Sequence, residues 1–296
     1  MVVALCLLVG YGYVRFFVSN GRTPNAGTVS LPHLTFAVPA IAQSTGAVTQ
    51  SSLPKWTLPI LMYHYVRVVD AQADPLGYRL SVTPPQLAEQ LDYLTTHGYH
   101  AVSPAVLMQS GPLPPKSVLL TFDDGYEDFY TAGWPIVRAH TDQALIFIIT
   151  GFMGKDSYLT SAQVRELAAQ GVTVGAHTIT HVNLATQSPT ELTRQLMQPK
   201  QVLEQLLQTS VPYVAYPSGK YNAGVLSASA IAGYKVGVTT HFGLATNNDD
   251  HLEFPRIEIL GSDSLADFAK KVEGIDPASE RAAAKSATAT DAATKP

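Results

Sequence analysis

The chain has 296 residues and a formal net charge of −4, with 46% hydrophobic and only 14% charged residues. An average soluble domain carries roughly 25% charged residues, so this composition excludes a disordered acidic or basic polypeptide. Residues 58–274 contain 13 basic and 20 acidic residues and no local basic stripe. Such a surface would repel a phosphate backbone, and we therefore expect no nucleic acid as a partner.

The two ends of the chain differ in composition from its middle. Residues 1–18 are almost wholly apolar apart from Arg15. The length of this segment is close to the lower limit for spanning a bilayer. No basic residue precedes Arg15, so an uncleaved membrane anchor is favoured over a cleaved signal peptide. Either segment implies an extracytoplasmic protein, membrane-anchored or secreted. Residues 19–57, rich in Pro, Ser, Thr and Gly, predict a flexible linker, and the Ala/Lys/Thr-rich residues 275–296 a disordered tail.

The remaining residues, 58–274, are expected to form one α/β domain. Short apolar runs alternate there with amphipathic ones, which is typical of βα units around a parallel sheet buried on both faces. Helices are predicted at 84–96, 161–170 and 190–208, and Pro199 should kink or divide the third. Seven strands are predicted, at 59–64, 118–123, 144–150, 172–177, 213–217, 235–240 and 254–259.

Several of these predicted strands end in a residue suited to chemistry. The clearest cases are His64, the neighbours Asp123 and Asp124, and His177. In a closed parallel barrel the carboxyl ends of all strands open onto one face, where active sites are built. A lone polar residue at a strand end is expected, because strands usually lead into polar turns. Adjacent aspartates and several histidines at strand ends are not explained in this way, because a buried charge needs a partner.

The acidic pair and a histidine pair together indicate a metal site. Two neighbouring carboxylates, as in Asp123 and Asp124, do not both ionise cheaply unless a cation or hydrogen bonds hold them, although an Asp-Asp-Gly turn is a common alternative. His177 and His181 are separated by three residues, so both can project from one side of a helical turn toward one ion. One Asp plus two His gives three protein ligands with an open fourth position, as in catalytic zinc sites.

These residues resemble a known family. The run TFDDG at 121–125, followed about fifty residues on by HTITH at 177–181, is similar to the first two motifs of the polysaccharide deacetylases of carbohydrate esterase family four, the NodB-homology domain. The resemblance covers most of residues 58–260. It implies a distorted (β/α)7 barrel and a metal-dependent removal of N-acetyl groups from sugar polymers.

The resemblance also implies a role for each motif residue. Asp123 would be the general base, and Asp124, His177 and His181 would hold a divalent metal, with Zn²⁺ expected first. A bound Zn²⁺ can lower the pKa of water from about 15.7 to about 7, and Asp123 can then take the proton. After the third-motif proline, the backbone N–H of Ser218 is the candidate donor to the oxyanion.

The sequence departs from the commonest form of the family in two places. Many members have an Arg two residues before the third-motif proline, to orient the catalytic Asp, and this chain has Ala215 there. Arg256, in the last predicted strand, either supplies that guanidinium or is an ordinary surface residue. The late motif that provides the general acid is absent after residue 241.

His64 is the first candidate for the missing general acid, and His241 is the second. The run PILMYH at 59–64 resembles the opening of a subgroup that acts on exported poly-N-acetylglucosamine, in which the domain is circularly permuted and the acid motif comes first. A histidine at a strand end can donate a proton near neutrality. A structural role is the alternative for His64.

The sequence thus predicts a metal-dependent hydrolase that removes N-acetyl groups from N-acetylglucosamine units of an extracytoplasmic polysaccharide. Its expected partners are an N-acetylated glycan polymer (poly-N-acetylglucosamine, peptidoglycan or a chitin-like chain) and, through its first residues, the membrane. One alternative is a non-catalytic carbohydrate-binding protein of the same fold, although binding alone has no need of an activated water. Another is a metal-dependent phosphoesterase, which usually needs a second metal or a basic clamp.

Overall fold

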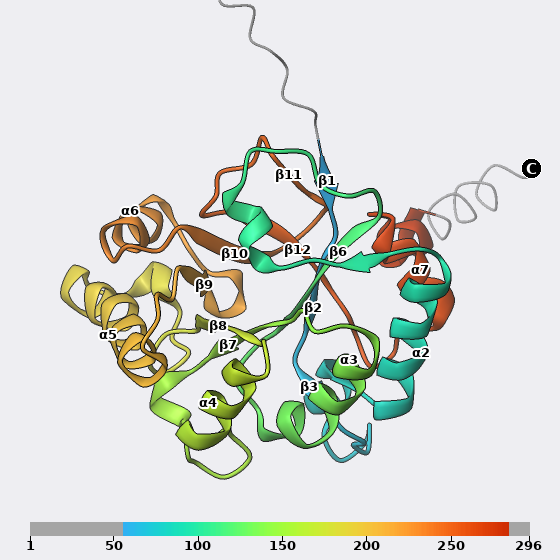
Figure 1. Cartoon of the computed structure of the whole chain (residues 1–296), viewed down its shortest axis with the longest axis horizontal. Coiled ribbons are helices and arrows are strands. Elements are labelled where there is room, and N and C mark those ends of the chain that lie inside the picture. Colours follow the sequence, from blue (N-terminus) through green and yellow to red (C-terminus); the bar gives the residue numbers. More distant parts are fainter. Residues whose placement is uncertain (1–55, 284–296) are drawn as a thin grey trace, which may run out of the picture. The chain divides into compact units, whose positions relative to one another are not determined.

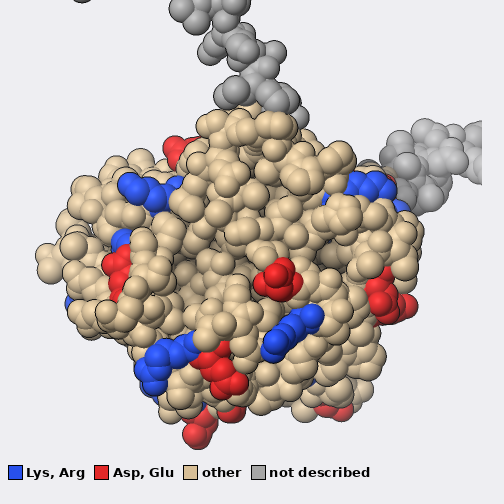
Figure 2. Space-filling view, in the orientation of Figure 1, with Lys and Arg blue, Asp and Glu red and all other residues tan. Residues whose placement is uncertain are grey.

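The computed structural model describes residues 56–283. The expected apolar segment at 1–18 and nearly all of the linker at 19–57 lie outside these residues. No helix within 56–283 is long and apolar enough to cross a bilayer. On the face shown in Figure 2, acidic and basic side chains are interspersed and separated by uncharged surface.

Seven parallel strands form a closed barrel, which confirms the fold class expected from the sequence (Figure 1). In spatial order they are β2 (Ile60–Tyr63), β12 (Phe254–Glu258), β10 (Val236–Phe242), β9 (Tyr213–Ala215), β8 (Thr173–Ala176), β7 (Leu145–Ile148) and β6 (Ser117–Phe122). The ring closes where β2 pairs with β6, Ile60 opposite Leu119. All seven strands lie where the hydrophobic runs predict them. A short strand, β5 (His100–Ala101), extends the sheet beside β6.

The other strands form two small sheets, and several short helical turns connect the larger elements. β1 (Thr57–Leu58) pairs antiparallel with β11 (Ala245–Thr246), and β3 (Tyr65–Val66) pairs parallel with β4 (Ser81–Val82). The short helical turns are η1 (Pro104–Met108), η2 (Phe129–Gly133), η3 (Thr150–Phe152), η4 (Leu184–Thr186) and η5 (Pro217–Gly219).

The α-helices, apart from α3, begin after a residue whose side chain accepts a backbone N–H of the first turn. They are α1 (Pro75–Leu80), α2 (Pro84–Thr96), α3 (Trp134–His140), α4 (Ser161–Ala169), α5 (Pro189–Leu207), α6 (Ala223–Ile231) and α7 (Leu265–Val272). Thr83 and Thr160 each cap a helix in a reciprocal arrangement with a glutamine three residues on. Such pairs satisfy two backbone N–H groups that a helix start leaves without partners.

The structure differs from the expected division of the third predicted helix and from the expected bounds of the folded part. α5 is one continuous helix through Pro199, which is buried on the same face as Leu192, Leu196 and Leu203. Burial of this apolar face offsets the hydrogen bond that the proline removes. The described fold also extends beyond 58–274, because Thr57 belongs to β1 and residues 277–283 are helical. Ion pairs of 2.6 Å from Lys270 to Glu280 and 2.7 Å from Arg281 to Asp267 join that segment to α7. Residues 284–296, the rest of the expected disordered tail, lie outside the described residues.

Alternate residues of the strands enter two separate cores. Side chains such as Ile60, Leu119 and Phe254 form a cluster inside the barrel. Their neighbours Leu61 and Leu120 belong to a larger cluster that includes the buried faces of the helices. Both faces of the strands are therefore buried, and polar side chains can gather only where the strands end.

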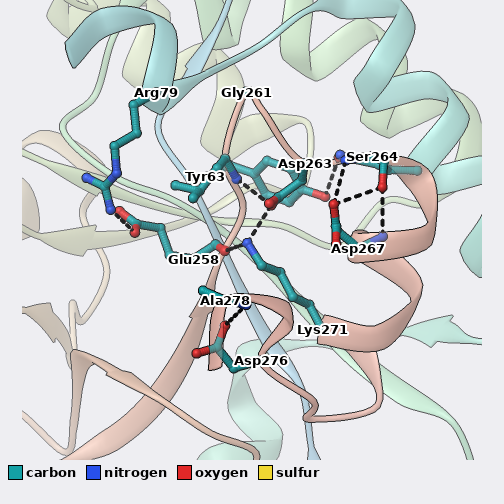
Figure 3. Close-up of polar contacts among 12 residues, drawn as sticks. Tyr63, Arg79, Glu258, Gly261, Asp263, Ser264, Asp267, Lys271, Asp276 and Ala278 are labelled. Carbon is teal, nitrogen blue, oxygen red and sulfur yellow. Dashed lines mark hydrogen bonds and ion pairs between the residues drawn. The ribbon is translucent and has the colours of Figure 1, made fainter. Parts of the chain in front are cut away.

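The end of β12 is fixed by buried charge (Figure 3). The Nζ atom of Lys271, on α7, donates to Asp263 Oδ2 at 2.5 Å and to the carbonyl of Glu258 at 2.9 Å. Asp263 Oδ2 also accepts the N–H of Leu260 at 2.8 Å, and the Glu258 carboxylate pairs with Arg79 of α1. These contacts tie the strand to α1 and α7 just beyond Arg256.

Candidate metal centre and catalytic residues

The acidic pair lies at the carboxyl end of β6, where a tight turn separates the directions of the two side chains. The N–H of Asp123 donates to the Tyr63 carbonyl at 2.9 Å and so continues the pairing of β6 with β2. Asp124 then adopts a left-handed backbone with φ +73°, and Gly125 follows with φ +76°. A side chain at Gly125 would place its Cβ 3.0 Å from Cδ1 of Ile148 on β7, so glycine suits this turn in both conformation and space.

Asp124, His177 and His181 converge as the expected metal ligands. Asp124 Oδ1 lies 3.4 Å from His177 Nε2 and 3.5 Å from His181 Nε2, and the three ligand atoms are all within 4.8 Å of one another. Asp124 Oδ1 is buried and has no hydrogen-bond partner among residues 56–283. A buried carboxylate oxygen in this state is costly, so this set of donors fits a divalent cation.

The surroundings prepare His177 to act as a ligand. Its Nδ1 donates to the Ala215 carbonyl at 2.8 Å, which leaves the lone pair on Nε2, toward Asp124. Burial by itself would lower the pKa of His177, but the nearby carboxylates of Asp124 and Asp123 raise it above its ordinary value. Burial and the neighbouring His177 lower the pKa of His181.

The two histidines come from an irregular turn and not from the helical turn that their spacing suggested. His177 directly follows β8, and residues 178–180 form a turn. Thr178 and His181 both have left-handed backbones, with φ +64° and +56°. The N–H of His181 donates to Thr178 Oγ1 at 3.0 Å, so the turn is braced internally.

Asp123 makes a two-pronged ion pair with Arg256 inside the barrel mouth. The Nη1 and Nη2 atoms of Arg256 lie 2.7 and 2.6 Å from the two carboxylate oxygens, and the arginine is wholly buried. Burial by itself would raise the pKa of Asp123, but the guanidinium outweighs it and holds this pKa below its ordinary value. Arg256 is therefore not a surface residue. From β12 it contacts the Asp123 carboxylate, which the short side chain of Ala215 on β9 cannot reach.

Comparison with known proteins identifies the family. Residues 110–237 match the family model described as polysaccharide deacetylase. The Bacillus subtilis protein YxkH, named as a polysaccharide deacetylase, is 30% identical over 222 residues, which cover 74% of this chain and 77% of YxkH. The chain belongs to the polysaccharide deacetylase family. Enzymes of this family hydrolyse N-acetyl amide bonds.

Further relatives of this deacetylase agree with the assignment. The deacetylase PplD of Streptococcus pyogenes, solved with acetate, superposes with a TM-score of 0.68 at 32% identity, covering 73% of this chain and 98% of PplD. The poly-beta-1,6-N-acetyl-D-glucosamine N-deacetylase of Staphylococcus aureus is 25% identical over 211 residues, or 66% of this chain and 72% of that protein. IcaB from Ammonifex degensii shares the fold, with a TM-score of 0.62 at 23% identity.

The deacetylase places its two candidate acids in different surroundings. His64 follows β2, whose last residue, Tyr63, lies opposite Phe122, the residue before Asp123. Its Nδ1 is buried and has no partner in the described part of the chain. His241, on β10, is exposed and lies 3.4 Å from the hydroxyl of Tyr221. Of the two candidate acids, His64 is thus the one that follows a strand paired with the strand of the acidic pair.

The deacetylase holds Ser218 in a turn just after β9. Ser218 has a left-handed backbone with φ +52°, between Pro217 and Gly219. The N–H groups of Gly219 and Lys220 make the hydrogen bonds of this turn, and neither bond uses the N–H of Ser218. A Cβ at Gly219 would lie 2.1 Å from Thr240 Oγ1, so only glycine lets the turn approach β10 this closely.

Two threonines that contact Arg256, Thr121 and Thr239, were not identified from the sequence. The Nε atom of Arg256 donates to the Thr239 carbonyl at 2.8 Å, and its Nη1 atom donates to Thr121 Oγ1 at 3.1 Å. Tyr65 and Tyr126 stack with ring centroids 3.7 Å apart, and Tyr158 packs on Tyr126 at 5.0 Å. The charge of Asp124 contributes to raising the pKa values of all three tyrosines, whose main cause is burial. An aromatic cluster therefore lies near Asp124, and the fold brings its members together from positions 65, 126 and 158.

Proposed function

We propose that this deacetylase uses a divalent metal, Zn²⁺ first, to remove N-acetyl groups from N-acetylglucosamine units of an extracytoplasmic glycan polymer. The observation that carries the proposal is the convergence of Asp124, His177 and His181 beside an Asp123 carboxylate that Arg256 keeps ionised. Binding a sugar requires no such arrangement, whereas hydrolysing an amide does.

Each residue near the acidic pair has a definite task in this proposal. A divalent metal, when bound, supplies a Lewis acid and makes water a better nucleophile near neutral pH. Asp123 accepts a proton from the attacking water, and Arg256 holds its carboxylate in place. The N–H of Ser218 donates to the carbonyl oxygen as that oxygen gains negative charge. His64 donates a proton to the departing amine.

The polymer is proposed to be poly-N-acetylglucosamine, with peptidoglycan or a chitin-like chain as the next substrates to test. The likeness of residues 59–64 to the opening of the permuted subgroup supports this choice, as does the similarity to the Staphylococcus aureus enzyme. An extracytoplasmic location rests on the apolar residues 1–18. Recovery of the full chain wholly in the soluble cytoplasmic fraction would count against that location.

The first test is metal removal. Treating the purified chain with a chelator should reduce acetate release from N-acetylglucosamine oligomers by several orders of magnitude, and adding back Zn²⁺ should restore it. The expected metal content is one divalent ion per chain, measured by elemental analysis. Metal-independent acetate release would overturn the proposed chemistry, and tight glycan binding without acetate release would identify a binding protein.

Replacing the two candidate acids one at a time tests the role of His64. His64→Ala should lower kcat by about 10²–10⁴-fold, the usual contribution of a general acid. His241→Ala should leave kcat within a few-fold of the wild-type value, because this histidine is exposed and contacts Tyr221. The measurement is steady-state acetate release at saturating metal. Unchanged turnover in the His64 variant would remove it from the mechanism.

A further inference from the structure

The turn that carries both histidine ligands is held in an unfavourable conformation. Two of its residues, Thr178 and His181, have left-handed backbones although neither is glycine. Threonine, with a branched Cβ, adopts this region at a cost. Such backbones persist only where the surrounding structure determines them, so the support of this turn decides where the two imidazoles point.

One glutamine side chain supports the turn from α5. Gln195 is 1% exposed. Its Oε1 atom accepts the N–H groups of Ile179 at 2.9 Å and Thr180 at 3.3 Å. Its Nε2 atom donates to Thr180 Oγ1 at 2.9 Å and to Glu191 Oε1 at 2.8 Å. Both acceptor and both donor positions of this amide are therefore in use.

The opposite side of the same turn is bound to η3. The N–H of Gly151 donates to the Ile179 carbonyl at 2.9 Å, and the N–H of Thr150 donates to the Thr178 carbonyl at 3.2 Å. A Cβ at Gly151 would lie 2.4 Å from the Ile179 oxygen, so the contact is a close one. The η3 backbone thus binds the carbonyls of the turn, and Gln195 binds its N–H groups.

We infer that Gln195 is a positioning residue for the metal centre, which holds residues 177–181 so that both histidine Nε2 atoms face Asp124. This inference rests on the proposed function, since it concerns affinity for the metal. Gln195 does not contact the ligand atoms themselves. It acts through the backbone of Ile179 and Thr180, midway between the two histidines. Groups that orient metal ligands in this way typically contribute 10–100-fold to metal affinity.

An amide is the side chain that this position requires. A glutamate would still accept the two N–H groups, but it would bring a second carboxylate to the oxygen of Glu191 that lies 2.8 Å from Gln195. Arg194, which pairs with Glu191 at 2.6 Å, would neutralise only part of that repulsion. A leucine would fill similar space and leave the two backbone N–H groups without a partner.

The test is the Zn²⁺ dissociation constant of the whole chain, measured by competition with a chromogenic chelator. Gln195→Leu should raise this constant by about 10–100-fold, and Gln195→Glu should raise it by less. The matched control is Gln90→Leu. Gln90 is also a buried helical glutamine, 3% exposed, but it bonds the Tyr63 hydroxyl and not the metal turn. Its variant should bind Zn²⁺ like the wild type.

Hydrogen exchange separates this inference from the proposed function. In the metal-free chain, Gln195→Leu should speed amide exchange at Ile179 and Thr180 by at least about 10-fold, and Gln90→Leu should not. Faster exchange with no Zn²⁺ binding even by the wild type would contradict the proposed function and leave Gln195 as the support of the turn. Unchanged exchange, or unchanged Zn²⁺ affinity in a wild type that binds it, would overturn the role of Gln195.

Discussion

Asp123→Asn should lower kcat by about 10²–10⁴-fold, because the amide has no basic oxygen able to take the proton of the attacking water. The bound metal should stay at the wild-type level, since Asp124, His177 and His181 are unchanged. KM should change little, because the lost group acts on the reacting water and not on the sugar. The measurements are acetate release at saturating metal and the metal content of the same preparation.

A second buried aspartate provides the control for that substitution. Asp263 is 7% exposed and pairs with Lys271 at 2.5 Å, so Asp263→Asn also breaks a buried ion pair. Removing one partner of such a pair typically costs 3–5 kcal/mol of folding free energy, and both variants should show a loss of this order in urea unfolding. Only the Asp123 variant should lose turnover. Wild-type turnover in a folded Asp123→Asn enzyme would exclude it as the base.

The barrel and its Asp124–His177–His181 cluster follow from patterns that the sequence displays directly. Continuous apolar runs such as 118–122 are the signature of strands buried on both faces, and the structure has a strand at each of the seven predicted runs. Because parallel strands end on one face, Asp124 and His177 were expected to meet, although about fifty residues separate them. Only the local form of the His177–His181 turn differs from the prediction.

The parts that the sequence does not reveal depend on partners far along the chain. Nothing adjacent to Arg256 shows that it bonds Asp123, which is 133 positions away, so a surface role was an equal alternative. Gln195 is one of many glutamines on an amphipathic helix, and only the folded chain shows its four hydrogen bonds. Pro199 does not divide α5, because local propensity ignores the packing that keeps the helix continuous.

Arg256→Met should abolish most activity and also destabilise the fold. Methionine fills part of the space but leaves the buried Asp123 carboxylate without the guanidinium that bonds both of its oxygens. Removing one partner of a buried pair typically costs 3–5 kcal/mol, so the urea midpoint should fall clearly. Asp123 would then favour its protonated form, in which it accepts no proton, and kcat should fall by about 10²-fold or more. Metal content should be retained.

Two further substitutions distinguish the geometry of Arg256 from its charge. Arg256→Lys keeps one positive charge but cannot bond both carboxylate oxygens at once, so it should recover stability more fully than turnover. Arg79→Met also removes an arginine from an ion pair, in this case with Glu258, which lies two residues after Arg256 on β12. Arg79, however, is half exposed. Exposed pairs contribute about 0–1 kcal/mol, so this variant should be nearly wild type in stability and kcat. If Arg256→Lys instead matched the wild type in turnover, a single buried charge would suffice, and the two-pronged contact would have no part in catalysis.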